Sequence, residues 1–164
     1  MDYKIEFVKA RQILDSRGNP TVEAEVATSS KVAKASAPSG ASKGMEEAFE
    51  LRDGSKEFHG KGVRKAVENI ETIIAPAIKG MDVREQDAID AKMIAIDGTK
   101  NKSLLGGNAC IAVSMAVCKC AAVCQNMQVY RYLNEKANLL PIPFMNVING
   151  GKHAGNDLAI QEHM

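Results

Sequence analysis

The last part of the sequence collects residue types that can do chemistry. Two adjacent glycines, which permit a close backbone approach, precede His153, Gln161 and Glu162. An imidazole can contact an anion or carry a proton, an amide can hydrogen-bond a hydroxyl, and a carboxyl group can act as a general acid or base. These groups follow an apolar run, residues 142–148, which predicts a buried strand. Because α/β barrels carry their chemistry at the carboxyl ends of strands, this segment is a candidate active-site loop.

The residues alone leave the roles in this segment open. Glu162 could serve as an acid or base or accept a hydrogen bond from a substrate hydroxyl, and it could equally be an ordinary exposed carboxylate. His153 stands out only because the glycine pair and the two later polar residues surround it. His59, which lies beside a single glycine, is given no role.

A second loop with possible chemistry spans residues 38–44, with the sequence PSGASKG. It could be a mobile flap whose serine oxygens reach a metal ion and whose amides face an anion. It could also be a solvated connection between a strand and a helix, and composition alone favours this second interpretation. The sequence contains neither the P-loop motif nor the dinucleotide-binding fingerprint, so neither phosphate cradle is predicted.

Three strands are expected near the start of the chain. Apolar residues mark a first strand near residues 5–14, and residues 15–20 are dense in turn formers. Residues 21–27 alternate between apolar and polar side chains, and a third strand is expected at 32–37. Short turns between these strands predict an antiparallel meander.

Helical patterns follow the strands. Asp82 and Glu85 resemble a capping box, and Asn108 is placed to cap a long Ala- and Cys-rich helix. Three strands followed by several helices predict an α+β domain that ends at a proline-containing boundary near residues 138–143. The expected helices cover residues 63–74, 82–96, 108–127 and 129–137.

The composition is that of a globular protein, with 164 residues, 45% apolar and 25% charged, and a net charge of +1. This balance gives no reason to expect nucleic acid or an anionic membrane as a partner. The least charged stretch, residues 103–130, contains Lys119 and small apolar residues, which predicts a core helix rather than a membrane span. The N-terminal residues are charged and alternating, unlike a signal peptide.

All four cysteines lie in the expected long helix, whereas a secreted disulfide framework would spread them along the chain. A reducing, cytoplasmic setting is therefore expected. Cys120 and Cys124 share a helix face, but no Cys-x-x-Cys pair is present. Buried small side chains are favoured over a zinc site.

Short segments along the whole chain resemble, in the same order, the enolase family. They are DSRGNPTVE (residues 15–23), PSGAS (38–42), ELRDG (50–54), GKGV (60–63), AVEN (66–69), DGT (97–99), PFMNVINGG (143–151) and QE (161–162). The resemblance implies an enolase N-terminal-like α+β domain over residues 1–137. It also implies that residues 138–164 are the first strand and loop of a C-terminal barrel.

The resemblance further implies a glycolytic hydro-lyase, phosphopyruvate hydratase, that dehydrates 2-phosphoglycerate to phosphoenolpyruvate with two Mg²⁺ ions. By matching motifs, Ser39 corresponds to a flap residue that completes the coordination of one Mg²⁺. His153 would meet the substrate near its phosphate, and Gln161 and Glu162 would line the substrate pocket, with Glu162 near the leaving hydroxyl. The complete protein is then expected to be a cytoplasmic homo-oligomer, a dimer or higher.

Two departures and one omission qualify the resemblance. His163 stands where an aromatic or apolar residue is common, and Lys152 where a small one is. The family's base lysine, its proton-donating glutamate and the carboxylates of the first metal site would all follow Met164, since a barrel takes about 250 residues. We expect an inactive fragment of a lyase, the alternative being a non-catalytic binding or assembly module that keeps only the small domain.

Overall fold

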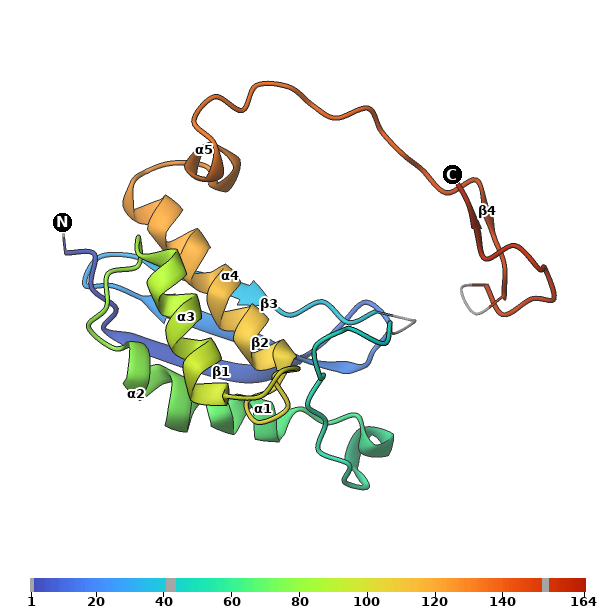
Figure 1. The fold of residues 1–164 in the computed structure, drawn as a ribbon, viewed down its shortest axis with the longest axis horizontal. Coiled ribbons are helices and arrows are strands. Elements are labelled where there is room, and N and C mark those ends of the chain that lie inside the picture. Colours follow the sequence, from blue (N-terminus) through green and yellow to red (C-terminus); the bar gives the residue numbers. More distant parts are fainter. Residues whose placement is uncertain (1, 41–43, 152–153) are drawn as a thin grey trace.

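The structure, a computed structural model, describes residues 2–40, 44–151 and 154–164. Its sheet is an antiparallel meander of β1 (Phe7–Leu14), β2 (Pro20–Ala27) and β3 (Val32–Ser36), in that order (Figure 1). Val8 pairs with Val26 and Ala24 with Ala35, so the apolar positions of the three strands share one face. This confirms the predicted meander and its alternation.

The helical part begins after a long connection. Its elements are η1 (Glu57–Gly60), α1 (Arg64–Asn69), η2 (Ile70–Ile74), α2 (Ala75–Ile78), α3 (Gln86–Asp97), α4 (Gly107–Cys124) and α5 (Val129–Leu133). The segments α1, η2 and α2 follow one another directly, and η2 is a π-helical turn just before Pro76. Because Pro76 has no N–H to donate to the preceding turn, a local change of helical pitch is expected there.

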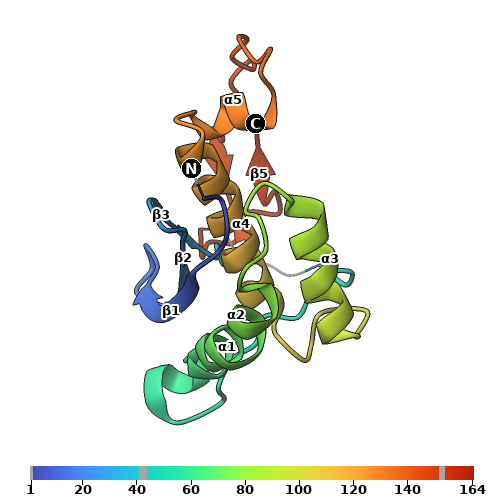
Figure 2. The same cartoon turned by 90° about the vertical axis from the view of Figure 1, so that its left-hand side faces the viewer.

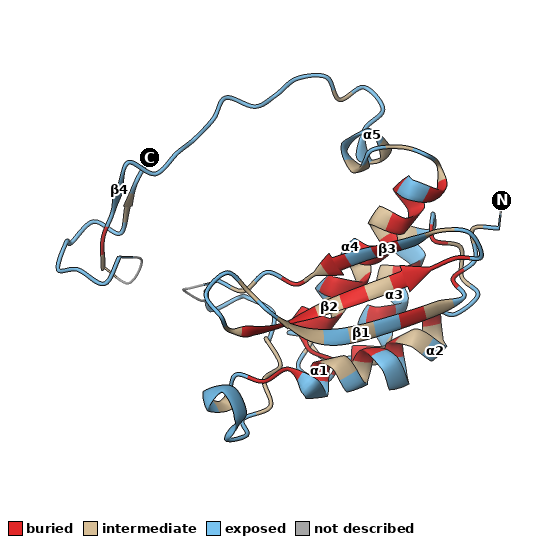
Figure 3. Cartoon of the chain, turned by 180° about the vertical axis from the view of Figure 1, so that it is seen from behind, coloured by how far each residue is buried: buried red, intermediate tan, exposed pale blue. Residues whose placement is uncertain are grey.

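The helices cover one face of the sheet, as Figure 2 shows. Helix α4 packs on β2 and β3, while α1 and η2 lie against β1. The core between these layers is made of aliphatic side chains from both, and Figure 3 shows its buried residues in red. The other face of the sheet is charged, with ion pairs between Arg11 and Glu23 and between Lys34 and Glu25. Three strands followed by a helical layer confirm the α+β class.

Both predicted helix caps are wrong, because the two residues bond other partners: Asp82 a local one and Asn108 a distant one. Helix α3 begins at Gln86, and the Asp82 carboxylate instead accepts hydrogen bonds from the backbone and guanidinium of Arg84. The cap position of α4 is held by Gly106, and Asn108 lies buried in the first turn. There the Asn108 amide pairs with both backbone groups of Leu51, at 3.1 Å each.

Gly106 cannot be replaced easily. Its φ of +96° is a conformation that favours glycine, and a Cβ atom there would lie 2.7 Å from the Leu51 side chain. The close approach of Leu51 to the start of α4 therefore depends on this glycine. Gly106 thus leaves room for the segment after the 38–44 loop, which the Asn108 hydrogen bonds hold against the helix.

Helix α4 carries the four cysteines, and all are free thiols. Cys120 and Cys124 are buried, in agreement with the prediction of core side chains, and burial raises the pKa of the Cys110 thiol to about 11. Among the described residues, α4 is the one helix long and apolar enough to cross a membrane. However, 61% of it is buried inside the domain, as expected for a core helix.

Residues 138–147 leave the helical layer as an extended segment (Figure 1). The prediction of a buried strand over residues 142–148 is wrong for this structure, since Ile142 is 82% and Phe144 84% exposed. Only Ile148–Asn149 forms a strand, β4, which pairs antiparallel with β5 (Glu162–His163). A buried barrel strand needs parallel neighbours and a covering helix, and no other described strand pairs with β4.

Candidate functional site

The loop that contains Ser39 is held at its start by the sheet. Beyond β3, the Ala37 N–H donates to the Val22 carbonyl at 2.8 Å. The hydroxyl of Thr21 donates to the Ala37 carbonyl at 2.6 Å, so the chain stays in register past the end of the strand. This anchoring places Ser39 beside the turn between β1 and β2.

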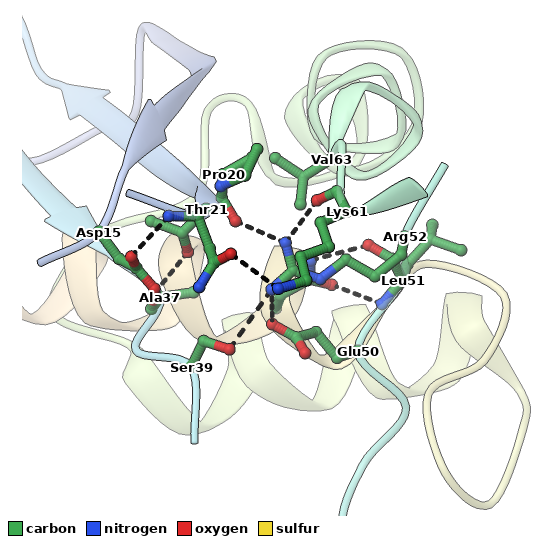
Figure 4. A network of polar contacts seen from close by, with 12 residues as sticks. Asp15, Pro20, Thr21, Ala37, Ser39, Glu50, Leu51, Arg52, Lys61 and Val63 are labelled. Atoms are coloured by element: carbon green, nitrogen blue, oxygen red, sulfur yellow. Dashed lines mark hydrogen bonds and ion pairs between the residues drawn. The ribbon is translucent and has the colours of Figure 1, made fainter. Parts of the chain in front are cut away.

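Arg52 is the centre of the polar network around this loop (Figure 4). Its Nη1 donates to the carbonyls of Pro20 at 2.5 Å and Lys61 at 2.6 Å. Its Nη2 contacts the Glu50 carboxylate at 2.5 Å and the Ser39 hydroxyl at 3.3 Å. One guanidinium therefore joins four segments: the start of β2, the segment before α1, the Ser39 loop and the irregular segment that carries Glu50 and Arg52.

The neighbouring turn supplies a second guanidinium. Arg17 Nη2 donates to the Ser39 carbonyl at 2.5 Å, so both oxygens of Ser39 accept from arginines. The turn itself is fixed by Asp15, whose Oδ1 accepts from the N–H groups of Arg17 and Asn19 at 2.8 and 2.9 Å. The hydrogen bond from Asn19 contributes most to a lowered pKa of the Asp15 carboxyl, with smaller contributions from Arg17 and Arg52.

This setting does not fit Ser39 as a metal ligand in the conformation described. Mg²⁺ prefers carboxylate, carbonyl and water oxygens, and two guanidinium groups close to Ser39 would repel a cation. Over residues 2–40, 44–151 and 154–164, no three His, Cys, Asp or Glu side chains are grouped as a metal site would need. The metal-binding role of Ser39 therefore remains a prediction, and these residues alone do not build the site.

The other predicted site residues lie in the terminal hairpin. Glu162 sits in β5 opposite Asn149, and its Oε1 accepts a hydrogen bond from the Asn146 amide at 3.2 Å. The Gln161 carbonyl accepts from the Gly150 N–H at 2.9 Å, while its side chain is exposed. The structure thus places Gln161 against Gly150, the first of the two glycines, and Glu162 opposite Asn149. His153 lies outside the described residues.

The structure does not bring the two predicted loops together. Figure 1 shows the β4–β5 hairpin separated from the sheet by the extended segment, whereas Ser39 belongs to the domain. Sequence reasoning also missed the Arg17 and Arg52 network. Both arginines lie in segments that carried the family resemblance, but only the fold shows that their donors converge on one loop.

Comparison with known proteins matches this architecture to a family. The family model described as "Enolase, N-terminal domain" matches residues 5–133, which hold the meander and its helices. The model described as "Enolase, C-terminal TIM barrel domain" matches residues 137–164. The chain belongs to the enolase family.

Individual relatives agree with this assignment. The chain is 58% identical over 163 residues to "Enolase" from Pyrococcus furiosus, covering 99% of this chain and 38% of the relative. It is 56% identical over 165 residues to "Enolase" from Methanothrix thermoacetophila, covering 100% and 39%. Against "Enolase B" from Dictyostelium discoideum, identity is 56% over 165 residues, covering 98% and 37%. The chain thus spans less than two fifths of the length of these curated relatives.

Proposed function

We propose that this chain is the amino-terminal part of an enolase, the glycolytic hydro-lyase that dehydrates 2-phosphoglycerate to phosphoenolpyruvate. The observation that carries the proposal is the succession of two family matches, with the N-terminal domain followed directly by the barrel model. Identity of 58% to a protein named enolase, over 99% of this chain, supports it. Residues 1–137 would then be the small domain and residues 138–164 the beginning of the barrel.

The chemistry assigned to this chain is limited to its own groups. Glu162 would present a carboxyl oxygen to the leaving hydroxyl, and the Asn146 amide would fix its orientation through the 3.2 Å hydrogen bond. Gln161 would hydrogen-bond the substrate, and His153 would contact the anionic phosphate end. Mg²⁺, when bound, would stabilise negative charge that develops after proton removal.

Ser39 would contribute an oxygen to that metal only after leaving Arg52 and Arg17. Such a change is compatible with a flap, whose closure excludes water and completes a site. The complete enzyme is proposed to be a cytoplasmic homo-oligomer that acts on a small phosphorylated acid. Neither nucleic acid nor a membrane is proposed as a partner.

The direct test places substitutions in the longer protein that contains this chain. Phosphoenolpyruvate formation is followed by absorbance with excess Mg²⁺ for the unaltered protein, Glu162→Gln, His153→Ala and the control Glu135→Gln. We expect Glu162→Gln to lower turnover by ~10²–10⁴-fold with KM largely kept, as a lost acid or base contribution does. His153→Ala should affect both turnover and KM, and Glu135→Gln neither.

The isolated 164-residue chain is expected to show no turnover, because catalytic groups act as a unit and most of them would be missing. Mg²⁺-dependent turnover by the pure chain would refute the expectation that the isolated chain is inactive. Absence of turnover from the longer protein would instead favour a non-catalytic module. Near-normal turnover of Glu162→Gln would refute the assigned role of Glu162 alone.

A further inference from the structure

An open pocket of about 340 Å³ lies beside the Ser39 loop. It is formed where the β1–β2 turn, the loop after β3 and the segment before α1 converge, and Figure 4 shows part of this convergence. Of the seven lining residues, three are cationic, one is anionic and three are neutral. Its lining residues are Arg17, Asn19, Ser39, Gly40, Glu50, Arg52 and Lys61.

Among the described residues, no carboxylate oxygen forms an ion pair or hydrogen bond with the side chain of Arg17 or Lys61, although the Asp15 carboxylate acts on Arg17 through space. Arg17 donates to the Ser39 carbonyl, and Lys61 Nζ donates to the Asn19 side-chain oxygen at 2.9 Å. Both acceptors are neutral, so neither charge is compensated by them. By contrast, Arg11, Arg64 and Arg84 are all ion-paired. Arg17 and Lys61 also keep further N–H donors for another acceptor.

The negative groups nearby are engaged elsewhere. Glu50 contacts Arg52 at 2.5 Å, so these two opposite charges offset each other. Asp15, next to the pocket, directs its carboxylate to the backbone of its own turn. Among the described residues, three cations and one carboxylate line the pocket, a net charge of +2 that the adjacent Asp15 carboxylate offsets in part. The remaining positive charge favours an anion such as phosphate.

We propose that this pocket binds a phosphate group between Arg17 and Lys61, with the Asn19 amide as a third donor. A guanidinium offers parallel N–H groups that match phosphate oxygens, and an ammonium adds a compact charge. Arg52 is not a ligand, because its donors already serve four acceptors, and it acts as the rigid back wall. The proposal depends on neither catalysis nor Mg²⁺ and goes beyond the proposed function.

Anion binding here would also act on the Ser39 loop. The Arg17 guanidinium that would contact phosphate is the same group that holds the Ser39 carbonyl at 2.5 Å. A bound phosphate would therefore compete with the Ser39 carbonyl for the Arg17 guanidinium. The hydrogen bond from Arg52 to the Ser39 hydroxyl would remain. Amide signals of Ser39 and Gly40 should consequently report occupancy together with those of Arg17 and Lys61.

The test is an NMR titration of the ¹⁵N-labelled 164-residue chain with inorganic phosphate at constant ionic strength, with a chelator present. We expect saturable shifts at Arg17, Ser39, Gly40 and Lys61. Arg17→Gln and Lys61→Gln should each weaken binding by about tenfold or more, because each loses a charged hydrogen bond. The control Lys79→Gln removes an exposed charge elsewhere and should leave binding unchanged.

A conservative variant and a second anion serve as further controls for the titration. Arg17→Lys retains the charge and should bind more tightly than Arg17→Gln, and unchanged amide signals across α4 would show that each variant is folded. Acetate at matched ionic strength should bind at least about tenfold more weakly than phosphate, because it carries half the charge and fewer acceptors. Shifts that grow linearly, persist in both Gln variants or are equal with acetate would overturn the proposal.

Discussion

The helical domain and the C-terminal segment contain the same kinds of apolar side chain but place them in opposite environments. Ile74 in η2 is fully buried, whereas Ile142 in the extended segment is 82% exposed. The domain has a sheet face and a helical layer that cover each other, whereas the described part of the segment has only a two-residue strand pair. Apolar side chains therefore form a buried core only where a second element packs against them.

The exposed C-terminal segment is expected to be covered in a complete enolase. Large exposed apolar groups over residues 139–148 form the kind of surface that is usually covered in a native protein. The family match of residues 137–164 to a barrel domain supports parallel neighbouring strands as that cover. The apolar side chains of the segment should consequently be much more exposed than those of the domain in this chain. In a protein that supplies the rest of a barrel, this difference in exposure should be small.

Proteolysis should show the largest difference. Thermolysin or chymotrypsin should cut near Leu139 and Phe144 roughly 10³-fold or more faster than within α4, because cutting the helix requires unfolding of the domain. Mass spectrometry of early products measures the order of cleavage. Equal protection of both regions at a concentration where the chain is monomeric would contradict the difference described.

A matched pair of core and segment substitutions should show the next largest effect. Ile74→Ala removes a fully buried side chain and should lower the free energy of unfolding by about 2–5 kcal/mol. Ile142→Ala makes the same chemical change at an exposed position and should stay within about 0.5 kcal/mol. Urea denaturation followed by circular dichroism gives both values. Similar losses in the two variants would mean that residue 142 is packed in solution.

The smallest effect is expected from a matched pair of carboxylates. Asp97 is 3% exposed, and it accepts hydrogen bonds from the Leu105 N–H at 2.7 Å and the Thr99 N–H at 3.0 Å. Burial alone would raise the pKa of Asp97, but the hydrogen bonds from Leu105 and Thr99 outweigh it and lower the pKa below 3.8. Asp97→Asn should lower the free energy of unfolding by about 1–2 kcal/mol near neutral pH, because the NH₂ group of the new amide would face a backbone N–H.

The pH dependence follows from the direction of that shift. A depressed pKa in the folded state contributes stability above the ordinary carboxyl pKa, and the contribution is lost as the pH falls through the folded value. The acid loss of stability below about pH 4 should therefore be shallower in Asp97→Asn than in the unaltered chain. Asp157→Asn, at an exposed position of the segment, should change neither the free energy of unfolding near neutral pH nor its decrease in acid. Parallel acid profiles for both variants would show that Asp97 is not the group responsible.

The fold was predictable where local pattern and burial agree. The alternation of residues 21–27 predicted β2, because Val22, Ala24 and Val26 all face the helical layer. The caps were not predictable, because Asn108 has the right type for a helix start but pairs with Leu51, which is 57 positions away. Asp82 was misassigned for a local reason, since it accepts hydrogen bonds from Arg84, only two positions away. A polar side chain bonds the partner that the folded chain brings to it, and the local sequence shows only one candidate.

The candidate site also contains residues that are grouped by sequence and residues that are grouped only by the fold. Gln161, Glu162 and the glycine pair are neighbours in the terminal hairpin, and their closeness in sequence was enough to group them. The Arg52 network joins residues 20, 39, 50 and 61, and nothing in their spacing indicates that one guanidinium contacts them all. The role of Ser39 stays a prediction, since its two oxygens face arginines in this structure.

The sequence by itself determined the class of fold, the apolar faces of strands and helices, and the family, because periodicity and short motifs are properties of neighbouring residues. Only the tertiary structure decided which donors meet at the Ser39 loop, which cysteines are buried, and that the side chains of the run at 142–148 are exposed. These outcomes depend on distances between residues far apart in the chain. Such distances are set by packing of the whole domain, which no local pattern encodes.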